Sequence, residues 1–520
     1  MYNKISSEWN KTVVLLTIVL SLFLSIYVLT DPLGSALTLS SIYNTLSTMF
    51  ESTYMYGSFI VLIFLLFIAL SRYGEIQVIL ENKEIYSFIS WGSMLFAAGI
   101  GAALLYWATV EWIDYYNILN TPLADKKEVM LYSRAYPLFH WSFTAWAIYC
   151  LPAVAFALAL TINKNSKLTF SGIFNINNKI LEILFDALFI GAILCGAGVG
   201  LGLSFPLIST IFSKIFSIER SAYLDICTIL VCLSIFSTSA YLGIQKGIKR
   251  LSNFNMVLVI LFLISILLLG PTKYILIHSI ESYGFLIKKY PELSFATGTT
   301  ISKDWSVFYW AWWMALAPMV GAFIVNISNG KTIRQIILGT ILIGSIGCIL
   351  SMSILSNLSI SLFEENILNS PELISKGLMS REDLIVETIS TLSFSYPLLI
   401  AFGIICIIFL STTYDSTSYI LASASMKSSN IESSGKLRLI FAFLLVIQPS
   451  LLMFIGGVDS FKWIMVIFSI PLLFINLLLL LSRSFNIKLV GMKTYQNPLY
   501  YWNQEINVSG IIQKYTPFTS

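Results

Sequence analysis

Long apolar runs separated by short polar segments dominate this chain of 520 residues. Each run is about as long as the ~20 apolar residues with which a helix crosses the hydrocarbon core of a bilayer. The runs are too uniformly apolar for the strands of a membrane β-barrel, in which lipid-facing and lumen-facing residues alternate. We therefore predict an all-α polytopic membrane protein with twelve transmembrane helices. The predicted spans are 13–29, 54–71, 88–109, 139–161, 187–205, 226–245, 251–270, 305–327, 336–358, 398–425, 439–457 and 463–481.

Composition agrees with this prediction and excludes several classes of protein. Charged residues make up 11% and hydrophobic residues 57% of the chain, whereas a soluble protein carries about 25% charged residues. The net charge of +4 gives no reason to expect a nucleic-acid partner. All six cysteines lie in apolar runs, where cysteine behaves as a small hydrophobe, so we expect no disulfide. The sequence contains neither HExxH nor GxSxG, and we do not expect an enzyme.

Basic residues in the short loops indicate the orientation of the chain. Three lysines lie between the fourth and fifth spans and three basic residues between the sixth and seventh, whereas the first loop on the opposite side has none. Since Lys and Arg are enriched in cytoplasmic loops, we predict a multi-pass protein in the lipid of the cell membrane, with both termini cytoplasmic. Outside, we expect an amphipathic surface helix around 274–287 and a solvated acidic loop over 363–387.

Two apolar runs contain helix-interrupting residues at corresponding positions. The third contains Gly99 and Gly101, and the eighth contains Pro318 and Gly321. In transporters, interrupted helices in matching places of two halves mark a binding site near the bilayer midplane. The five-span separation predicts two five-helix repeats, although small residues also simply allow helices to pack closely. The predicted parts are 12–73 (two additional helices), 86–270 (first repeat, spans three to seven), 271–304 (external amphipathic connector), 305–482 (second repeat, spans eight to twelve) and 483–520 (short cytoplasmic tail).

Tryptophans gather inside a predicted span, whereas most tryptophans of membrane proteins lie at the interfaces. Four of them occur within residues 305–313. In the fourth span, Trp146 and Tyr149 are three residues apart and share a helical face. Two helices with facing rings can form a cage for a quaternary ammonium ion, with about 0.5–2 kcal/mol from each desolvated ring. Ordinary core or interfacial aromatics are the alternative interpretation.

Several segments carry motifs of one known family. The eighth span reads Trp-Ser-Val-Phe-Tyr-Trp-Ala-Trp-Trp over 305–313, the fourth span begins Phe-His-Trp at 139–141, and Thr-Thr-Tyr-Asp-Ser occupies 412–416. With these motifs the sequence resembles the betaine/choline/carnitine transporter family. The resemblance implies a leucine-transporter-like fold with an inverted 5+5 repeat, and alternating-access transport of an onium solute such as glycine betaine, choline or carnitine. It also implies a homotrimer.

The resemblance assigns residues to the substrate path by position. Those residues are Trp141, Trp146, Tyr149 and Trp313 for the central cage, Trp312 for its cytoplasmic side, Trp305 for the outer path, and Gly99 and Gly101 for the unwound segment. Three positions depart from the family. Ala103 replaces the third glycine of Gly-x-Gly-x-Gly, Leu316 replaces a tryptophan common in betaine carriers, and Asn329 replaces an arginine. These departures leave the particular substrate open.

The family contains both sodium-coupled symporters and sodium-independent exchangers. By resemblance, oxygens of the third and tenth spans would bind the sodium ion, at Ala97, Ile100, Phe409, Thr412 and Thr413. In the sodium-independent carnitine exchangers a methionine and an arginine replace the ion, whereas this chain has Val320 and Asn255 there. We therefore predict sodium symport, with the coupling ion and no other cofactor, and a sodium-independent onium antiporter is the alternative. The two threonines can also simply bond to carbonyls of their own helix.

Few charged side chains fall within the predicted spans, where each is a candidate for function. Glu111 closely follows the third apolar stretch, so it either lines the outer mouth of the path or lies at a solvated helix end. Asp415 is expected to hold the tenth span in place. The two histidines, His140 and His278, lack a partner at ligand spacing, and we interpret both as structural.

Overall fold

The computed structural model describes residues 9–80, 84–99, 101–162, 167–242, 245–427, 433–453 and 457–480. Within these ranges the chain forms helices, and its β-type pairings are two isolated bridges, Trp9–Met426 and Gln77–Thr332. The prediction of an all-α fold is therefore confirmed. The predicted cytoplasmic tail, 483–520, lies outside the described residues.

Several helices of the N-terminal half begin at a side-chain cap. The second helix starts with Pro32 after Asp31, whose carboxylate accepts a hydrogen bond from the Gly34 amide at 3.0 Å. Both residues suit a first helical turn, because its amides have no partner within the helix. The elements of this half are α2 (Lys11–Thr30), α3 (Pro32–Leu70), η1 (Arg72–Glu75), α4 (Phe88–Gly99), α5 (Ala102–Leu119), α6 (Lys126–Trp141), α7 (Phe143–Ile162), α8 (Phe170–Phe174), α9 (Lys179–Phe216), α10 (Ala222–Leu242) and α11 (Gln245–Leu269).

Side-chain caps also begin helices in the C-terminal half. Thr332 and Gln335 form a reciprocal capping box at the start of its longest helix, which satisfies two amides of the first turn. The elements of this half are α12 (Thr272–Phe295), the π-helical turn η2 (Ser302–Ser306), α13 (Val307–Ile327), α14 (Ile333–Glu364), α15 (Ser370–Ser375), α16 (Arg381–Ser390), α17 (Ser395–Ala424), α18 (Gly435–Met453) and α19 (Gly457–Leu480).

Each predicted span overlaps a helix or a pair of helices, but breaks interrupt some of them. In the described part of the chain, seven helices are long and apolar enough to cross a membrane, by length and composition. The third predicted span is divided between α4 and α5, and α12 follows α11 at a bend of 110°. Twelve membrane crossings and the boundaries of the two repeats therefore stay predictions.

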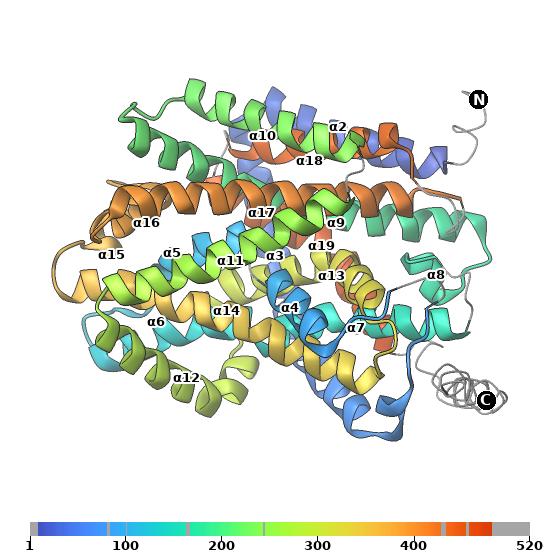
Figure 1. Cartoon of the computed structure of the whole chain (residues 1–520), viewed down its shortest axis with the longest axis horizontal. Helices are drawn as coiled ribbons and strands as arrows, with labels where there is room; N and C mark the ends of the chain where they lie inside the picture. The colour runs from blue at the N-terminus through green and yellow to red at the C-terminus, as the bar shows by residue number, and fades with distance from the viewer. Residues whose placement is uncertain are drawn as a thin grey trace, which may run out of the picture.

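The helices lie side by side in one bundle, with short helices at its two ends. α15 and α16 lie at one end and α8 at the opposite end (Figure 1). The sequence predicts that α8 lies in an inside connection and that α16 begins within the 363–387 outside connection. Their separation agrees with a chain that alternates between the two sides.

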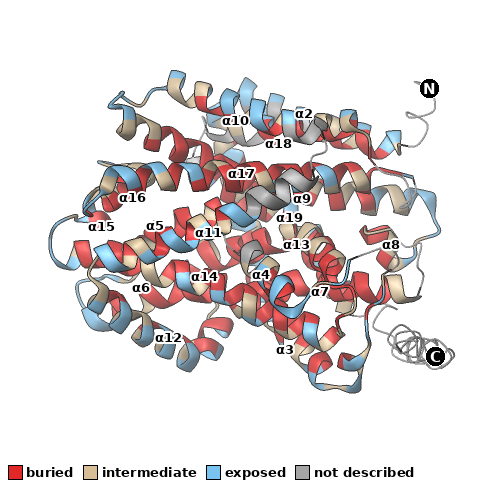
Figure 2. Ribbon diagram, viewed as in Figure 1, coloured by how far each residue is buried: buried red, intermediate tan, exposed pale blue. Residues whose placement is uncertain are grey.

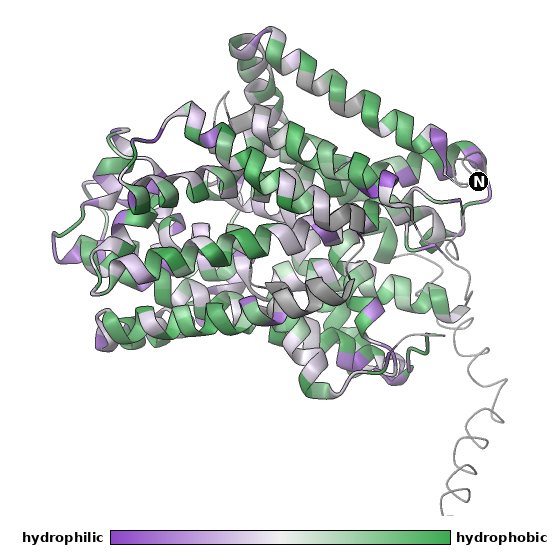
Figure 3. Cartoon of the chain, turned by 45° about the horizontal axis from the view of Figure 1, so that its top comes forward, coloured by the Kyte–Doolittle hydropathy of each residue, from purple (hydrophilic) through white to green (hydrophobic). Residues whose placement is uncertain are grey.

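Burial is greatest in the middle of the bundle (Figure 2). There α13 packs against α7, α9 and α19. Outer helices expose large apolar side chains, such as Phe23 on α2 and Leu230 on α10, and hydrophilic residues gather near helix ends and connections (Figure 3). Such a surface suits lipid, because helices satisfy their own backbone groups and apolar side chains are stable in hydrocarbon.

The connector after α11 is helical, as the sequence predicts for 274–287. α12 buries Ile275 and Leu286 against the bundle, while Leu276, Ile280 and Ile287 are exposed. The exposed side is therefore largely apolar, which suits a helix that lies against lipid.

Candidate functional site

Four aromatic rings from three helices meet in the middle of the bundle. Trp313 of α13 lies 4.6 Å from Tyr149, 5.3 Å from Trp141 and 6.4 Å from Trp146, measured between ring centroids. None of the four side chains is more than 6% exposed. The structure thus brings together the four residues that the resemblance assigns to the cage, which we call the aromatic cage.

Two local interruptions of the helices orient these rings. α6 ends at Trp141 because Ser142 leaves the helical conformation, and the Ser142 carbonyl then accepts the Trp146 amide at 3.1 Å as α7 begins. On the other side, the π-helical turn η2 precedes α13. π-helical turns are frequent at functional sites, because the wider turn changes the direction of the side chains that follow it.

The remaining tryptophans of the eighth span serve different contacts. Trp312 lies 5.8 Å from Trp141 and donates its indole N–H to the Gly196 carbonyl of α9 at 2.9 Å. Leu316, at the position of the missing tryptophan, packs so closely on Gly196 that a Cβ there would lie 2.9 Å from its Cγ. Trp310 instead packs against Phe139, outside the aromatic cage.

Trp305 belongs to a separate layer of rings. Trp107 and Tyr115 of α5 lie 5.6 Å and 5.8 Å from it. The Lys462 ammonium of α19 lies 4.2 Å from the centre of the Trp305 ring and is also paired with Asp459 at 3.3 Å. A cation of the protein itself therefore covers this ring, so an onium ion would have to displace Lys462 to use the same face.

The short helix α16 lies against the rings that surround Trp305. Arg381 of α16 forms two 2.7 Å hydrogen bonds with Asp114 of α5, and its guanidinium lies 5.9 Å from the Trp107 ring. Lys214 of α9 pairs with Glu387 at 2.6 Å. The expectation of a solvated loop is wrong for this part of 363–387, because residues 384–386 are fully or almost fully buried.

Sequence analysis missed a buried polar network beside the cage. Glu111 is 0% exposed and accepts hydrogen bonds from the Tyr115 hydroxyl at 2.6 Å and the Trp141 indole at 2.8 Å. His140 is also 0% exposed and connects Tyr115 with Ser306. The alternative of a solvated helix end is therefore wrong for Glu111. The four-residue spacing of Glu111 and Tyr115 on one helix was the signal that could have revealed this network.

The break between α4 and α5 lies at Gly101, with an extended backbone at φ −140° and ψ 172°. Any residue adopts this conformation, so the backbone at this position does not by itself require glycine. A Cβ added to Gly101 would meet nothing within 4 Å. The first turn of α5 has no side-chain cap, which leaves amides that suit an anionic group. Gly99 and Ala97 lie in the last turn of α4, and Ile100 lies outside the described residues.

Replacing Gly101 with valine should preserve the fold and weaken ligand binding by about tenfold or more. The backbone tolerates a side chain, but that side chain would occupy the open space at the helix break. Affinity measured by tryptophan fluorescence on purified protein, with thermal stability measured in parallel, tests this. Wild-type affinity in a stable Gly101→Val protein would show that the break does not approach the ligand.

Within the described residues, the positions assigned to sodium lie on two helices, with Ala97 on α4 and the others on α17. On α17, the Thr412 hydroxyl donates to the carbonyls of Ile408 at 3.0 Å and Phe409 at 3.1 Å, and Thr413 is exposed. These bonds use the proton of Thr412 and leave oxygen lone pairs that can still accept a cation. Asn255 of α11 is buried beside this helix and donates to the Ile405 carbonyl at 3.4 Å.

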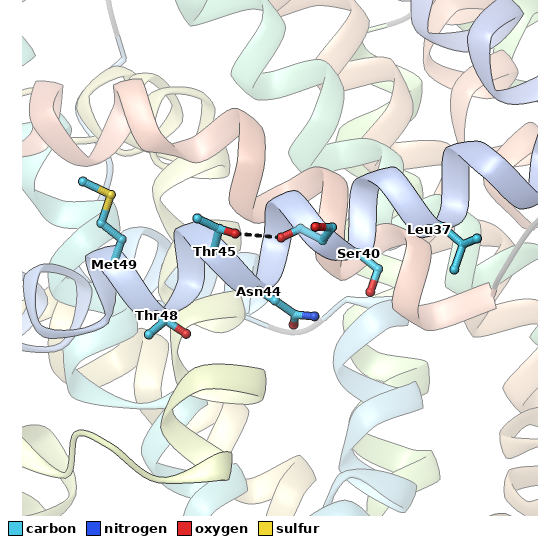
Figure 4. A pocket seen from close by; sticks show the side chains of 7 residues that line it. Leu37, Ser40, Asn44, Thr45, Thr48 and Met49 are labelled. Atoms are coloured by element: carbon cyan, nitrogen blue, oxygen red, sulfur yellow. Dashed lines mark hydrogen bonds between the residues drawn. The ribbon is translucent and has the colours of Figure 1, made fainter.

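A polar groove runs along α3. Its lining comes from one helical face, and Thr45 there donates to the Ser41 carbonyl (Figure 4). The lining residues are Leu37, Ser40, Ser41, Asn44, Thr45, Thr48 and Met49. They include no aromatic or charged side chain, so this groove lacks the chemistry of a site for an organic cation.

Comparison with known proteins identifies the class to which the fold and the aromatic cage belong. The family model of the betaine/carnitine/choline transporters matches residues 12–489. This chain belongs to that family, and it is therefore a membrane transporter rather than an enzyme.

Similar proteins span most of the chain. A carnitine transporter of Acinetobacter baumannii is 28% identical over 445 residues, which cover 83% of this chain and 80% of that protein. The glycine betaine transporter OpuD of Bacillus subtilis is 28% identical over 438 residues, with 81% and 83% covered. An ectoine/hydroxyectoine transporter of Virgibacillus pantothenticus is 26% identical over 442 residues, with 83% and 87% covered.

Proposed function

We propose that this transporter takes up a quaternary-ammonium or related onium solute by sodium symport with alternating access. The observation that carries the proposal is the meeting of four buried rings around Trp313. Desolvated ring faces attract a cation that has no hydrogen-bond donors, which an ordinary polar site cannot hold well. The similar proteins named for carnitine and glycine betaine support the same class of solute.

The polar residues around the cage support recognition of a zwitterion in particular. The Trp313 indole N–H is buried and finds no acceptor among the residues that the structure describes. The uncapped first turn of α5 adds backbone amides at the helix break. A carboxylate, such as that of glycine betaine or carnitine, would satisfy donors of this kind.

Two features support coupling to sodium: the oxygens of the tenth span, and the residues at the two positions where sodium-independent exchangers carry a methionine and an arginine. Thr412 and Phe409 present oxygens on one face of α17. Val320 and Asn255 stand where sodium-independent exchangers carry residues that replace the ion. We place the protein in the cell membrane with both termini cytoplasmic, which the distribution of basic loop residues supports.

Binding of a panel of onium solutes to purified protein tests the proposal. Glycine betaine, choline and carnitine are added separately while tryptophan fluorescence is recorded, and bound solutes are then tested for uptake into liposomes. At least one solute should bind saturably and accumulate, because the rings that report binding also form the cage. If none of the three binds, the assignment of the cage to an onium solute is wrong.

A further inference from the structure

A buried carboxylate lies directly behind the aromatic cage. Glu111 has two separately engaged oxygens: Oε1 accepts the Tyr115 hydroxyl at 2.6 Å, and Oε2 accepts the Trp141 indole N–H at 2.8 Å. Trp141 is itself a cage ring, at 5.3 Å from Trp313 and an interplanar angle of 83°. One hydrogen bond therefore joins the carboxylate to the cage.

The hydrogen bonds around Glu111 are complete with a neutral histidine. The Ser306 hydroxyl can donate to Nε2 of His140 at 2.8 Å, and Nδ1–H can donate to the Tyr115 oxygen at 2.8 Å. Tyr115 then donates onward to Glu111. Each polar atom of this chain has a partner without a second proton on the imidazole, so the network requires no positive charge on His140.

Cationic side chains on the surrounding helices are engaged with other acids. Arg381 binds Asp114, three residues beyond Glu111 on α5, and Lys462 binds Asp459. Nδ1 of His140 lies 3.3 Å from Oε1 of Glu111, but the neutral imidazole adds no positive charge there. In the described ranges, no lysine or arginine forms an ion pair with Glu111. A carboxylate at 0% exposure in a membrane protein is costly unless its charge is compensated. The charge of Glu111 is therefore available to a cation that arrives from outside the protein.

On the basis of the proposed function, we propose that Glu111 supplies the counter-charge for the bound onium ion and acts through Trp141. The hydrogen bond to the carboxylate holds the indole in place and increases the electron density of the ring, which strengthens its attraction for a cation. The field of the carboxylate adds to this attraction, since low-dielectric surroundings screen it weakly. Glu111 is thus a positioning residue that makes the cage select for positive charge as well as for the shape of the trimethyl group.

Pairs of ligands that differ only in the onium charge test this proposal. Choline is compared with dimethylbutanol, and glycine betaine with tert-butylacetate, in which carbon replaces the quaternary nitrogen. Wild-type protein should prefer the onium member of a pair. Glu111→Gln should narrow the ratio of the two affinities by about tenfold, because it weakens the attraction for the quaternary nitrogen, which only the onium member carries. The carboxylate that glycine betaine and tert-butylacetate share responds equally in both ligands and cancels in the ratio.

Matched variants distinguish the loss of the Glu111 charge from damage to the structure. Glu51→Gln removes another buried acid, whose partners are the Gly298 amide and the Ser302 hydroxyl, and should leave the ratio unchanged. If Glu111→Gln does not fold, Glu111→Asp and Glu111→Asn repeat the comparison, and only the asparagine should narrow the ratio. Equal weakening of both ligands by the neutral variants would overturn the counter-charge and leave the cage intact. If wild-type protein binds no onium solute, the proposed function itself fails.

Discussion

Replacing Trp313 with leucine is expected to lower the affinity for an onium solute by about tenfold or more. Trp313 is the ring that lies next to the other three, at 4.6 Å from Tyr149 and 5.3 Å from Trp141. A desolvated cation–π contact contributes about 2 kcal/mol, which corresponds to a roughly 30-fold change in the dissociation constant. Titration of purified protein with glycine betaine or choline, read by the remaining tryptophans or by radiolabelled ligand, measures the change.

Two substitutions make this prediction specific for the ring face. Trp313→Phe should have a smaller effect on choline, which has no carboxylate to accept the indole N–H, because it keeps an aromatic face and breaks no hydrogen bond that the described structure contains. Trp310→Leu removes an equally buried indole from the same helix, but one that packs against Phe139 and His140. It should reduce stability while affinity stays near that of the wild type. Unchanged affinity in Trp313→Leu would show that the onium ion binds elsewhere.

Replacing sodium with potassium is expected to abolish most of the uptake into liposomes. A cation bound between the third and tenth spans would favour the conformation that binds substrate, so sodium and solute would raise each other's affinity. Removing both hydroxyls, with Thr412→Ala and Thr413→Ala together, should raise the sodium concentration that gives half-maximal uptake. The affinity for solute at saturating sodium should change less. Uptake measured as a function of sodium concentration at fixed solute separates the two effects.

A neighbouring threonine provides the control for this experiment. Thr417 also bonds to a carbonyl of its own helix, that of Thr413 at 2.7 Å, but it does not belong to the assigned sodium set. Thr417→Ala should therefore leave the sodium dependence unchanged. Wild-type uptake that is the same in potassium buffer would favour the sodium-independent antiporter, and Thr412 would then be a residue that only bonds within α17.

The candidate site could be predicted where short family motifs contain its residues, but not where residues far apart in the sequence join one hydrogen-bond network. Trp141, Trp146, Tyr149 and Trp313 could be named because the motifs that contain them resemble those of a known family, and the structure places them together. For Glu111, only Tyr115, four residues away on the same helix, could have been named from the spacing, because His140 and Trp141 lie 29 and 30 residues away. Whether such a carboxylate is solvated or buried depends on packing between helices.

The sequence by itself determined the class of structure. Runs of about 20 apolar residues can be stable in lipid only as helices, so the all-α membrane fold follows from composition and run length alone. Tertiary structure decided which faces of those helices meet. It placed Lys462 over the Trp305 ring and buried Glu111 beside Trp141. It also joined α16, part of which the sequence predicts to be solvated, to α5 through the hydrogen bonds between Arg381 and Asp114. The reason is that run length and hydropathy do not specify which polar group will find a partner, whereas each buried polar group must find one when the helices pack.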